Sequence, residues 1–130
     1  METNNATREP ARDRFAAQEH FLDIEEAAKR LLSEPDKGQN GHRQIALHKT
    51  SHTTIALFVF EPGGRIPQHR AHGAVIIQTL QGRLRVATTE SNHTLSPGQV
   101  LVLAPDVPHD VTAEEASRML LTVSLAPPKV

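Results

Sequence analysis

The sequence predicts an all-β domain, a sandwich or barrel of short strands, with one helix ahead of it. From His42 onward, short runs rich in β-branched and apolar residues recur at even spacing. Turn signals such as Pro62-Gly63-Gly64 and Pro97-Gly98 separate these runs. No stretch between them has the length and period of a helix, a pattern typical of sandwiches and barrels. The 130 residues suffice for one domain of ordinary size.

The helical pattern lies in residues 20–34. Asp23 is placed to cap the first turn, and Glu26 three residues later completes a capping box. Pro35 then ends the pattern. One stripe of the helix carries the apolar side chains Ile24, Ala27, Ala28, Leu31 and Leu32. We therefore expect this helix to pack against one side of the β domain.

The domain boundaries follow from these patterns. We expect an N-terminal arm over residues 1–19, the amphipathic helix and a linker over 20–41, the β domain over 42–126, and a tail over 127–130. The arm is either loose or exchanged with a partner subunit. It has no apolar core of the kind found in signal peptides, and no apolar run reaches 18 residues. We expect a cytoplasmic protein with no membrane partner.

Composition excludes several classes of site. With no cysteine, the chain has neither disulfides nor thiolate metal sites. Lys and Arg number 14 against 15 Asp and Glu, and Trp and Tyr are absent, so we expect no nucleic-acid partner. Neither a phosphate-cradling glycine loop nor a G-x-S-x-G nucleophile motif occurs. We expect no nucleotide or organic cofactor. Eight histidines remain as the chemically distinctive residues.

Two segments resemble the signature motifs of the cupin superfamily, which are small jelly-roll β-barrels. The first is Gly63–Gly82, GGRIPQHRAHGAVIIQTLQG, and the second is Gly98–His109, GQVLVLAPDVPH. His69 and His109 stand at histidine positions of the two motifs. The resemblance covers residues 42–126 and implies a jelly-roll barrel with a pocket inside. It is closest to small single-domain bacterial cupins with an incomplete set of metal ligands.

In metal-binding cupins, two histidines and a glutamate of the first motif and a histidine of the second hold a divalent metal. This chain keeps His69 and His109, but Ala71 and Val75 replace the other two ligands. His72 lies one residue past the missing histidine and would reach the same site if the strand bulged at Gly73. The resemblance thus implies a metal site of His69, His72 and His109 that holds Zn, Ni, Fe, Mn or Cu. Alternatively, His72 is an exposed or interface histidine.

Two functional hypotheses remain open, and the sequence does not decide whether the protein is an enzyme. In the first, a metal held by the histidines acts on a small molecule. In the second, a metal-free pocket binds a small ligand without catalysis. The residues expected to line the pocket are Gln78, Val75, Ile77 and Val102. The spacing of the remaining histidines, His20, His42, His48, His52 and His93, suggests no site, and we expect them at the solvated surface.

The chain also carries segments that are apolar on successive residues, such as AVIIQTL and VLVLA. Sheets apolar on both faces need cover on both sides. The helix or a second subunit would provide the outer cover, and we expect a homodimer, the usual state in the cupin superfamily.

Overall fold

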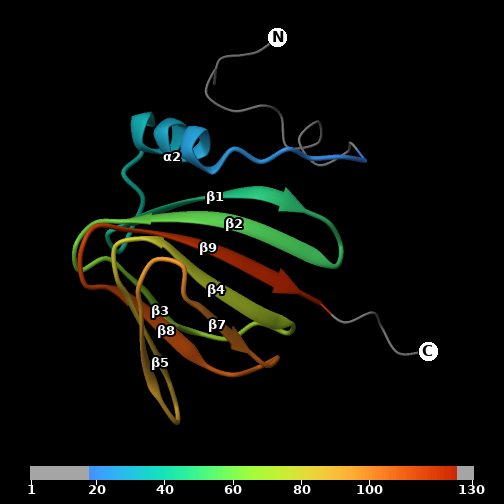
Figure 1. Cartoon of the computed structure of the whole chain (residues 1–130), viewed down its shortest axis with the longest axis vertical. Helices are drawn as coiled ribbons and strands as arrows, with labels where there is room; N and C mark the ends of the chain where they lie inside the picture. Colours follow the sequence, from blue (N-terminus) through green and yellow to red (C-terminus); the bar gives the residue numbers. More distant parts are fainter. Residues whose placement is uncertain (1–17, 126–130) are drawn as a thin grey trace.

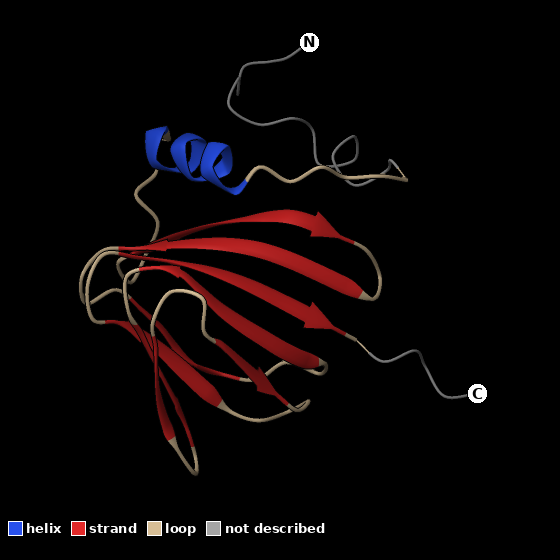
Figure 2. Ribbon diagram, in the orientation of Figure 1, coloured by secondary structure: helices blue, strands red, loops and turns tan. Residues whose placement is uncertain are grey.

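Two antiparallel sheets face one another in the computed structural model, which describes residues 18–125 (Figures 1 and 2). One sheet has the strand order β1-β2-β9-β4-β7, and the other has the order β3-β8-β5-β6. Helix α2 lies over β1 and β2. The elements are α2 (Ile24–Ser33), β1 (His42–Lys49), β2 (Thr53–Phe60), β3 (Arg65–His69), β4 (Ala74–Gln81), β5 (Leu84–Thr88), β6 (Asn92–Leu95), β7 (Val100–Leu103), β8 (His109–Ala113) and β9 (Ser117–Ser124).

The predicted all-β class with a single preceding helix is confirmed for the described part of the chain. Its strands form a sandwich and not a barrel closed by hydrogen bonds, because β1 and β7 are the edges of one sheet and β3 and β6 those of the other. The predicted arm (1–19) and tail (127–130) fall almost wholly outside the described residues. Within those residues, no helix is long and apolar enough to cross a membrane.

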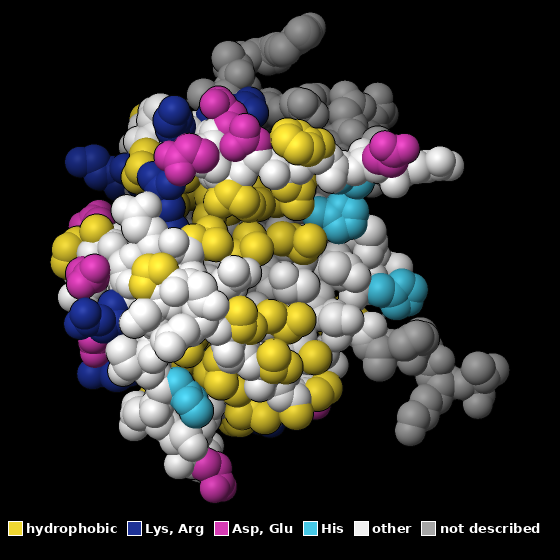
Figure 3. Space-filling model, viewed as in Figure 1, with side chains coloured by type: hydrophobic (Ala, Val, Ile, Leu, Met, Phe, Trp, Pro, Cys, Tyr) yellow, Lys and Arg dark blue, Asp and Glu magenta, His cyan; other side chains and the backbone are white. Residues whose placement is uncertain are grey.

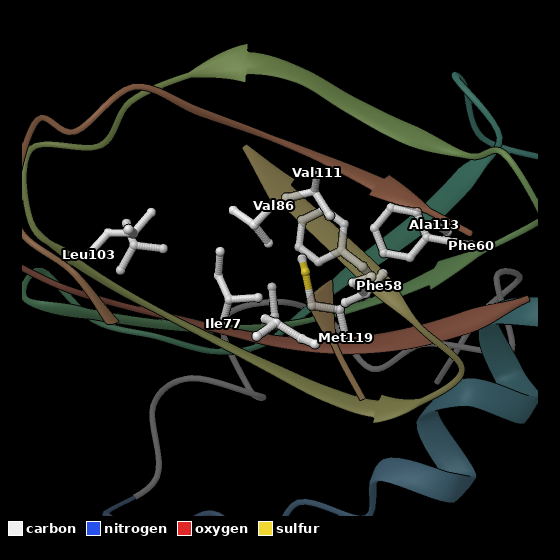
Figure 4. Close-up of a cluster of buried hydrophobic side chains, with 12 residues drawn as sticks. Phe58, Phe60, Ile77, Val86, Leu103, Val111, Ala113 and Met119 are labelled. Atoms are coloured by element: carbon white, nitrogen blue, oxygen red, sulfur yellow. The ribbon is translucent and has the colours of Figure 1, made fainter. Parts of the chain in front are cut away.

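The core lies between the two sheets (Figure 4). Strand residues alternate between two faces, so every second side chain of each strand points inward. In β4, for example, Val75 and Ile77 are buried in the core, whereas the intervening Ile76 is only half-buried. The buried core residues are Ala56, Phe58, Phe60, Val75, Ile77, Leu84, Val86, Leu95, Leu103, Val111, Ala113 and Met119. This packing holds the sheets together by apolar burial.

Helix α2 covers the outer face of the first sheet over β1 and β2. The Asp23 carboxylate accepts a hydrogen bond from the backbone N–H of Glu26 (3.0 Å), which confirms the predicted N-cap. At the other end, the Arg43 guanidinium donates to the carbonyl oxygens of Leu31, Leu32 and Glu34 at 3.0–3.1 Å. These carbonyls lie at the C-terminal end of the helix, where intrahelical donors run out, so a cation from β1 adds hydrogen bonds there and complements the helix dipole.

A second small core forms beneath α2. Ala28 and Leu31 of the helix are buried there against Leu47 and Leu57 of the sheet. Leu32, which belongs to the predicted apolar stripe, is instead 48% exposed. The helix therefore contacts the sheet through a narrower stripe than its sequence suggested.

A matched pair of substitutions tests this division into inside and outside. Leu84→Ala removes a fully buried side chain and should lower the free energy of unfolding by about 2–5 kcal/mol. Leu32→Ala makes the same chemical change at a half-exposed helix position and should cost well under about 1 kcal/mol. Urea denaturation of both variants measures the difference, and equal costs would contradict the assigned core.

Candidate functional site

His69 and His109 lie side by side at one end of the sandwich. His69 is the last residue of β3 and His109 the first of β8, and the antiparallel register of the two strands pairs them directly. Their ring centroids are 4.3 Å apart, with the ring planes tilted by 56°. His109 is buried, with 2% exposure, whereas His69 is exposed. One imidazole thus reaches into the core and the other stays open to solvent.

Backbone carbonyls hold both rings in the same way. Nδ1 of His69 donates to the Pro67 carbonyl oxygen (2.9 Å), and Nδ1 of His109 donates to that of Val107 (3.0 Å). A carbonyl oxygen only accepts, so in each neutral imidazole the proton sits on Nδ1. Nε2 of each ring then keeps its lone pair. This is how metal-ligating histidines are oriented, and it equally suits accepting a proton from a ligand.

The environment of His109 favours the neutral imidazole. Burial lowers the pKa of His109 below its ordinary value of 6.5. The neighbouring His69 ring adds to that lowering, whereas the hydrogen bond to Val107 and the negative charge of Asp110 oppose it. At neutral pH, His109 is therefore uncharged and able to act as a ligand or a proton acceptor.

His72 does not join this pair. Its Nδ1 is 2.9 Å from the Asp106 carboxylate, and its side chain is 89% exposed. In residues 18–125, no group of three or more His, Cys, Asp or Glu side chains is arranged to hold a metal ion. The three-histidine cluster expected from the sequence is thus not assembled, because His72 extends outward to the loop before β8.

A bulge at Gly73 was the condition for His72 to reach the site, and the irregularity in the pairing of β3 lies elsewhere. The irregular step in β3 pairing falls between Ile66 and His69. Gly73 is buried against β9, where a Cβ would collide with the carbonyl oxygen of Ser124. Glycine is therefore required here for the close approach of two backbones.

The four residues expected to line a pocket divide between two faces of one sheet. Val75 and Ile77 point inward and are 3% and 0% exposed, as part of the packed core. Gln78 and Val102 lie on the outer face, where Val102 is 63% exposed. The structure therefore does not bring the Gln78 amide toward the histidine pair.

Two hollows in the described surface are lined by residues other than His69 and His109. One, of about 380 Å³, is on the outer face of the second sheet and is lined by Arg65, Arg85 and Asp110 among others. Another, of about 340 Å³, lies beside the end of α2 and includes Arg43 and Arg118. The sequence analysis did not find either, because each combines side chains from strands distant in the chain.

Residues 55–130, more than half of the chain, match the family of the AraC-like ligand binding domain. The chain belongs to this family. The cupin resemblance of the two histidine motifs is thereby confirmed, and solved cupin structures share the fold. No curated protein matches the chain.

Several solved structures resemble this AraC-like ligand binding domain in fold. A conserved protein of unknown function from Streptococcus pyogenes has 22% identity and a TM-score of 0.68, over 86% of this chain and 92% of that one. A cupin superfamily protein from Desulfitobacterium hafniense has 17% identity and a TM-score of 0.67, over 87% and 96%. KdgF from a Halomonas species has 22% identity and a TM-score of 0.62, over 73% and 85%. At these identities the likeness shows the fold alone.

The lowered pKa of His109 predicts a pH dependence of stability in metal-free protein. Between the lowered folded-state pKa and the unfolded value of about 6.5, the unfolded chain binds more protons than the folded one. The free energy of unfolding should therefore fall as the pH drops below about 6.5. Urea denaturation from pH 7.5 to 5.5, with a chelator present, measures this slope. His109→Gln should flatten it, and an unchanged slope in that variant would contradict the assignment.

Proposed function

We propose that this cupin domain binds a small molecule at the His69–His109 pair, and that the pair holds a divalent metal through which the ligand is bound. The observation that carries the proposal is the common orientation of the two rings, in which carbonyls fix both Nδ1 protons and leave both Nε2 atoms free. The matched family, a ligand binding domain, favours binding over catalysis.

The two imidazoles fit a metal as a partial ligand set. Two imidazoles on one tetrahedral Zn²⁺, at N–metal bonds of about 2.0–2.1 Å, place their ring centres roughly 5 Å apart. The observed separation of 4.3 Å is shorter, so metal binding would turn the two rings slightly apart. Imidazole nitrogen suits Zn, Cu, Ni and Fe, whereas Mn prefers oxygen ligands. His69 and His109 would hold the metal, and a metal so bound supplies a Lewis acid with open positions.

The surroundings of the pair favour a small ligand with an apolar part. Ala71 and Val107 flank the histidines in sequence, and both pack as half-buried apolar residues against the core. Val75 and Ile77 fill the space between the sheets, so a ligand at this site would sit at the end of the sandwich. A few polar contacts among apolar walls are the usual composition of small-molecule sites.

The metal-free alternative has its own support. Two ligands are fewer than the three that protein zinc sites usually supply. The position at which metal-binding cupins carry the glutamate is Val75, which is buried and apolar here. Without a metal, His69 and His109 would bind the ligand by hydrogen bonds, each accepting through Nε2.

Metal content separates the two alternatives. Tag-free protein, loaded with Zn²⁺ and desalted, should lose one equivalent of zinc in His69→Gln and in His109→Gln when measured by elemental mass spectrometry. His93→Gln, on strand β6, is the matched control and should keep the wild-type content. Circular dichroism confirms that each variant folds. Equal zinc content in all four proteins would contradict metal binding at the pair and leave the metal-free pocket.

We further propose that the domain forms a homodimer through the outer face of β4, β7 and β9. Val100 and Val102 of β7 are 49% and 63% exposed there, beside half-buried Ile76 and Leu120. Figure 3 shows hydrophobic side chains gathered on the strands below α2. Contiguous exposed apolar side chains of this kind mark interaction sites, and a two-fold dimer would cover the same face of both subunits.

A charge placed on this face tests the dimer. Val102→Glu puts a carboxylate at the centre of the proposed interface and should convert the dimer to a monomer, because burying an unpaired charge is costly. Thr94→Glu, on exposed β6 of the other sheet, is the control and should leave the mass unchanged. Size-exclusion chromatography with light scattering gives the masses. A monomeric wild type, or a Val102→Glu dimer, would contradict the proposal.

A further inference from the structure

The outer face of the second sheet carries a row of polar side chains that the histidine site does not use. Strands β3, β8 and β5 lie side by side (Figure 1), and their register sets Thr112 between Arg65 and Arg85. The neighbouring residues Ile66 and Val86 pack in the core, so alternation turns the two arginines outward, where both are exposed. One hydroxyl and two guanidinium groups therefore share one face of three adjacent strands.

The next outward-facing row along these strands leaves a hollow above the sheet. Ala87 of β5 pairs with Asp110 of β8 and with Asn92 of β6, and its short side chain leaves space beside the two arginines. The hollow has a volume of about 380 Å³ and is lined by these three residues together with Arg65 and Arg85. Small-molecule sites span about 300–1,000 Å³, so this volume suits a small ligand.

Both guanidinium groups are available to such a ligand. Within the described part of the chain, no carboxylate forms an ion pair with the Arg65 guanidinium. The Arg85 guanidinium lies 3.8 Å from the Glu114 carboxylate, and the two side chains are 50% and 33% exposed. An exposed ion pair at this distance is weak, so an anionic ligand can compete with it.

The backbone of Arg65 is held in place although β3 is an edge strand. Its N–H donates to the carbonyl oxygen of Asn40 (2.8 Å), and its carbonyl oxygen accepts from Nδ1 of His42 (3.0 Å). Strand β8 is hydrogen-bonded to both β3 and β5, which sets their backbones about 10 Å apart. Ligand binding then has to order only the side chains of the two arginines.

We propose that this hollow binds a phosphate monoester with a small, hydroxyl-bearing organic part, independently of the histidine pair. The planar guanidinium group donates in a fork that matches the oxygens of a phosphate. A phosphate monoester carries a charge of about −1.5 to −2 near pH 7, which two guanidinium groups balance. A carboxylate has one charge and two oxygens, so it would satisfy one arginine and leave the other. Arg65 and Arg85 would hold the phosphate, and Thr112 would donate its hydroxyl to it.

The other end of the hollow favours the organic part of the ligand. Asp110 lies one outward-facing position further along β8 and repels the phosphate from that end. Its carboxylate accepts hydrogen bonds from hydroxyl groups, and the nearby Asn92 amide can donate or accept. The ligand is thereby oriented, with its phosphate over the arginines and its hydroxyl groups toward Asp110.

Amide chemical shifts locate the ligand and give its affinity. The ¹⁵N-labelled full chain, stripped of metal and desalted into phosphate-free buffer, is titrated with glycerol 3-phosphate, inorganic phosphate or glycerol. We expect glycerol 3-phosphate to shift amides of β3, β8 and β5 saturably, inorganic phosphate to bind more weakly, and glycerol not to bind. Arg65→Gln and Arg85→Gln should each weaken binding of the ester by about tenfold, because each removes charge-assisted hydrogen bonds.

Arg83→Gln is the matched control. Arg83 precedes β5, lies 3.9 Å from the same Glu114 carboxylate and is 51% exposed, but it does not line the hollow. Its substitution removes the same net charge and should change the affinity by less than about twofold, since salt screens exposed charges. A loss equal to that of Arg85→Gln would overturn the proposal, as would the absence of saturable shifts or shifts centred on the histidine pair. Equal affinity for inorganic phosphate and the ester would overturn the assignment of the organic part.

Discussion

The alternation of side chains along paired strands is the constraint on which the fold and its candidate site both depend. In β4 it sends Val75 and Ile77 into the core and leaves Ile76 and Gln78 outside. In the second sheet, the antiparallel register of β3 and β8 sets His69 opposite His109. Because one pairing fixes both rings, the site needs no mobile loop to bring them together.

Hydrogen bonds to backbone carbonyls orient the two imidazole rings that the strand register brings together. Each histidine donates through Nδ1 to a carbonyl two residues earlier in its own segment, so the local chain sets the tautomer of its own ring. The environments then differ, because His109 is buried and His69 faces solvent. A site with one buried neutral ring and one accessible ring can hold a metal or ligand from one side while remaining open on the other.

One of the metal-ligand positions of metal-binding cupins is occupied in this chain by a residue of the apolar core. Val75, where metal-binding cupins carry a glutamate, is 3% exposed and part of the core. A carboxylate there would need a metal or another partner to offset its burial, whereas valine contributes apolar contacts. Valine at this position therefore belongs to the apolar core, and His69 and His109 are the two motif histidines that remain paired.

Much of the fold and both histidines of the candidate site could be predicted from the sequence. Turn signals and apolar runs gave the strands, and motif spacing identified His69 and His109. Gln78 was misassigned although its signal was available, because it is an odd number of residues from Val75 and so lies on the other face. The direction of His72 and the ring contact between His20 and His48 depend on a turn and on tertiary packing, which spacing along the chain does not reveal.

The most direct test of the account is the tautomeric state of the two rings at the site. Long-range ¹H–¹⁵N correlation spectra of ¹⁵N-labelled, metal-free protein near pH 7.5 distinguish protonated from unprotonated ring nitrogens. The account predicts a protonated Nδ1 and an unprotonated Nε2 in both His69 and His109, with both Nε2 resonances shifting when Zn²⁺ is added. A proton on Nε2 of either ring, with no response of that ring to Zn²⁺ or to ligand, would contradict it.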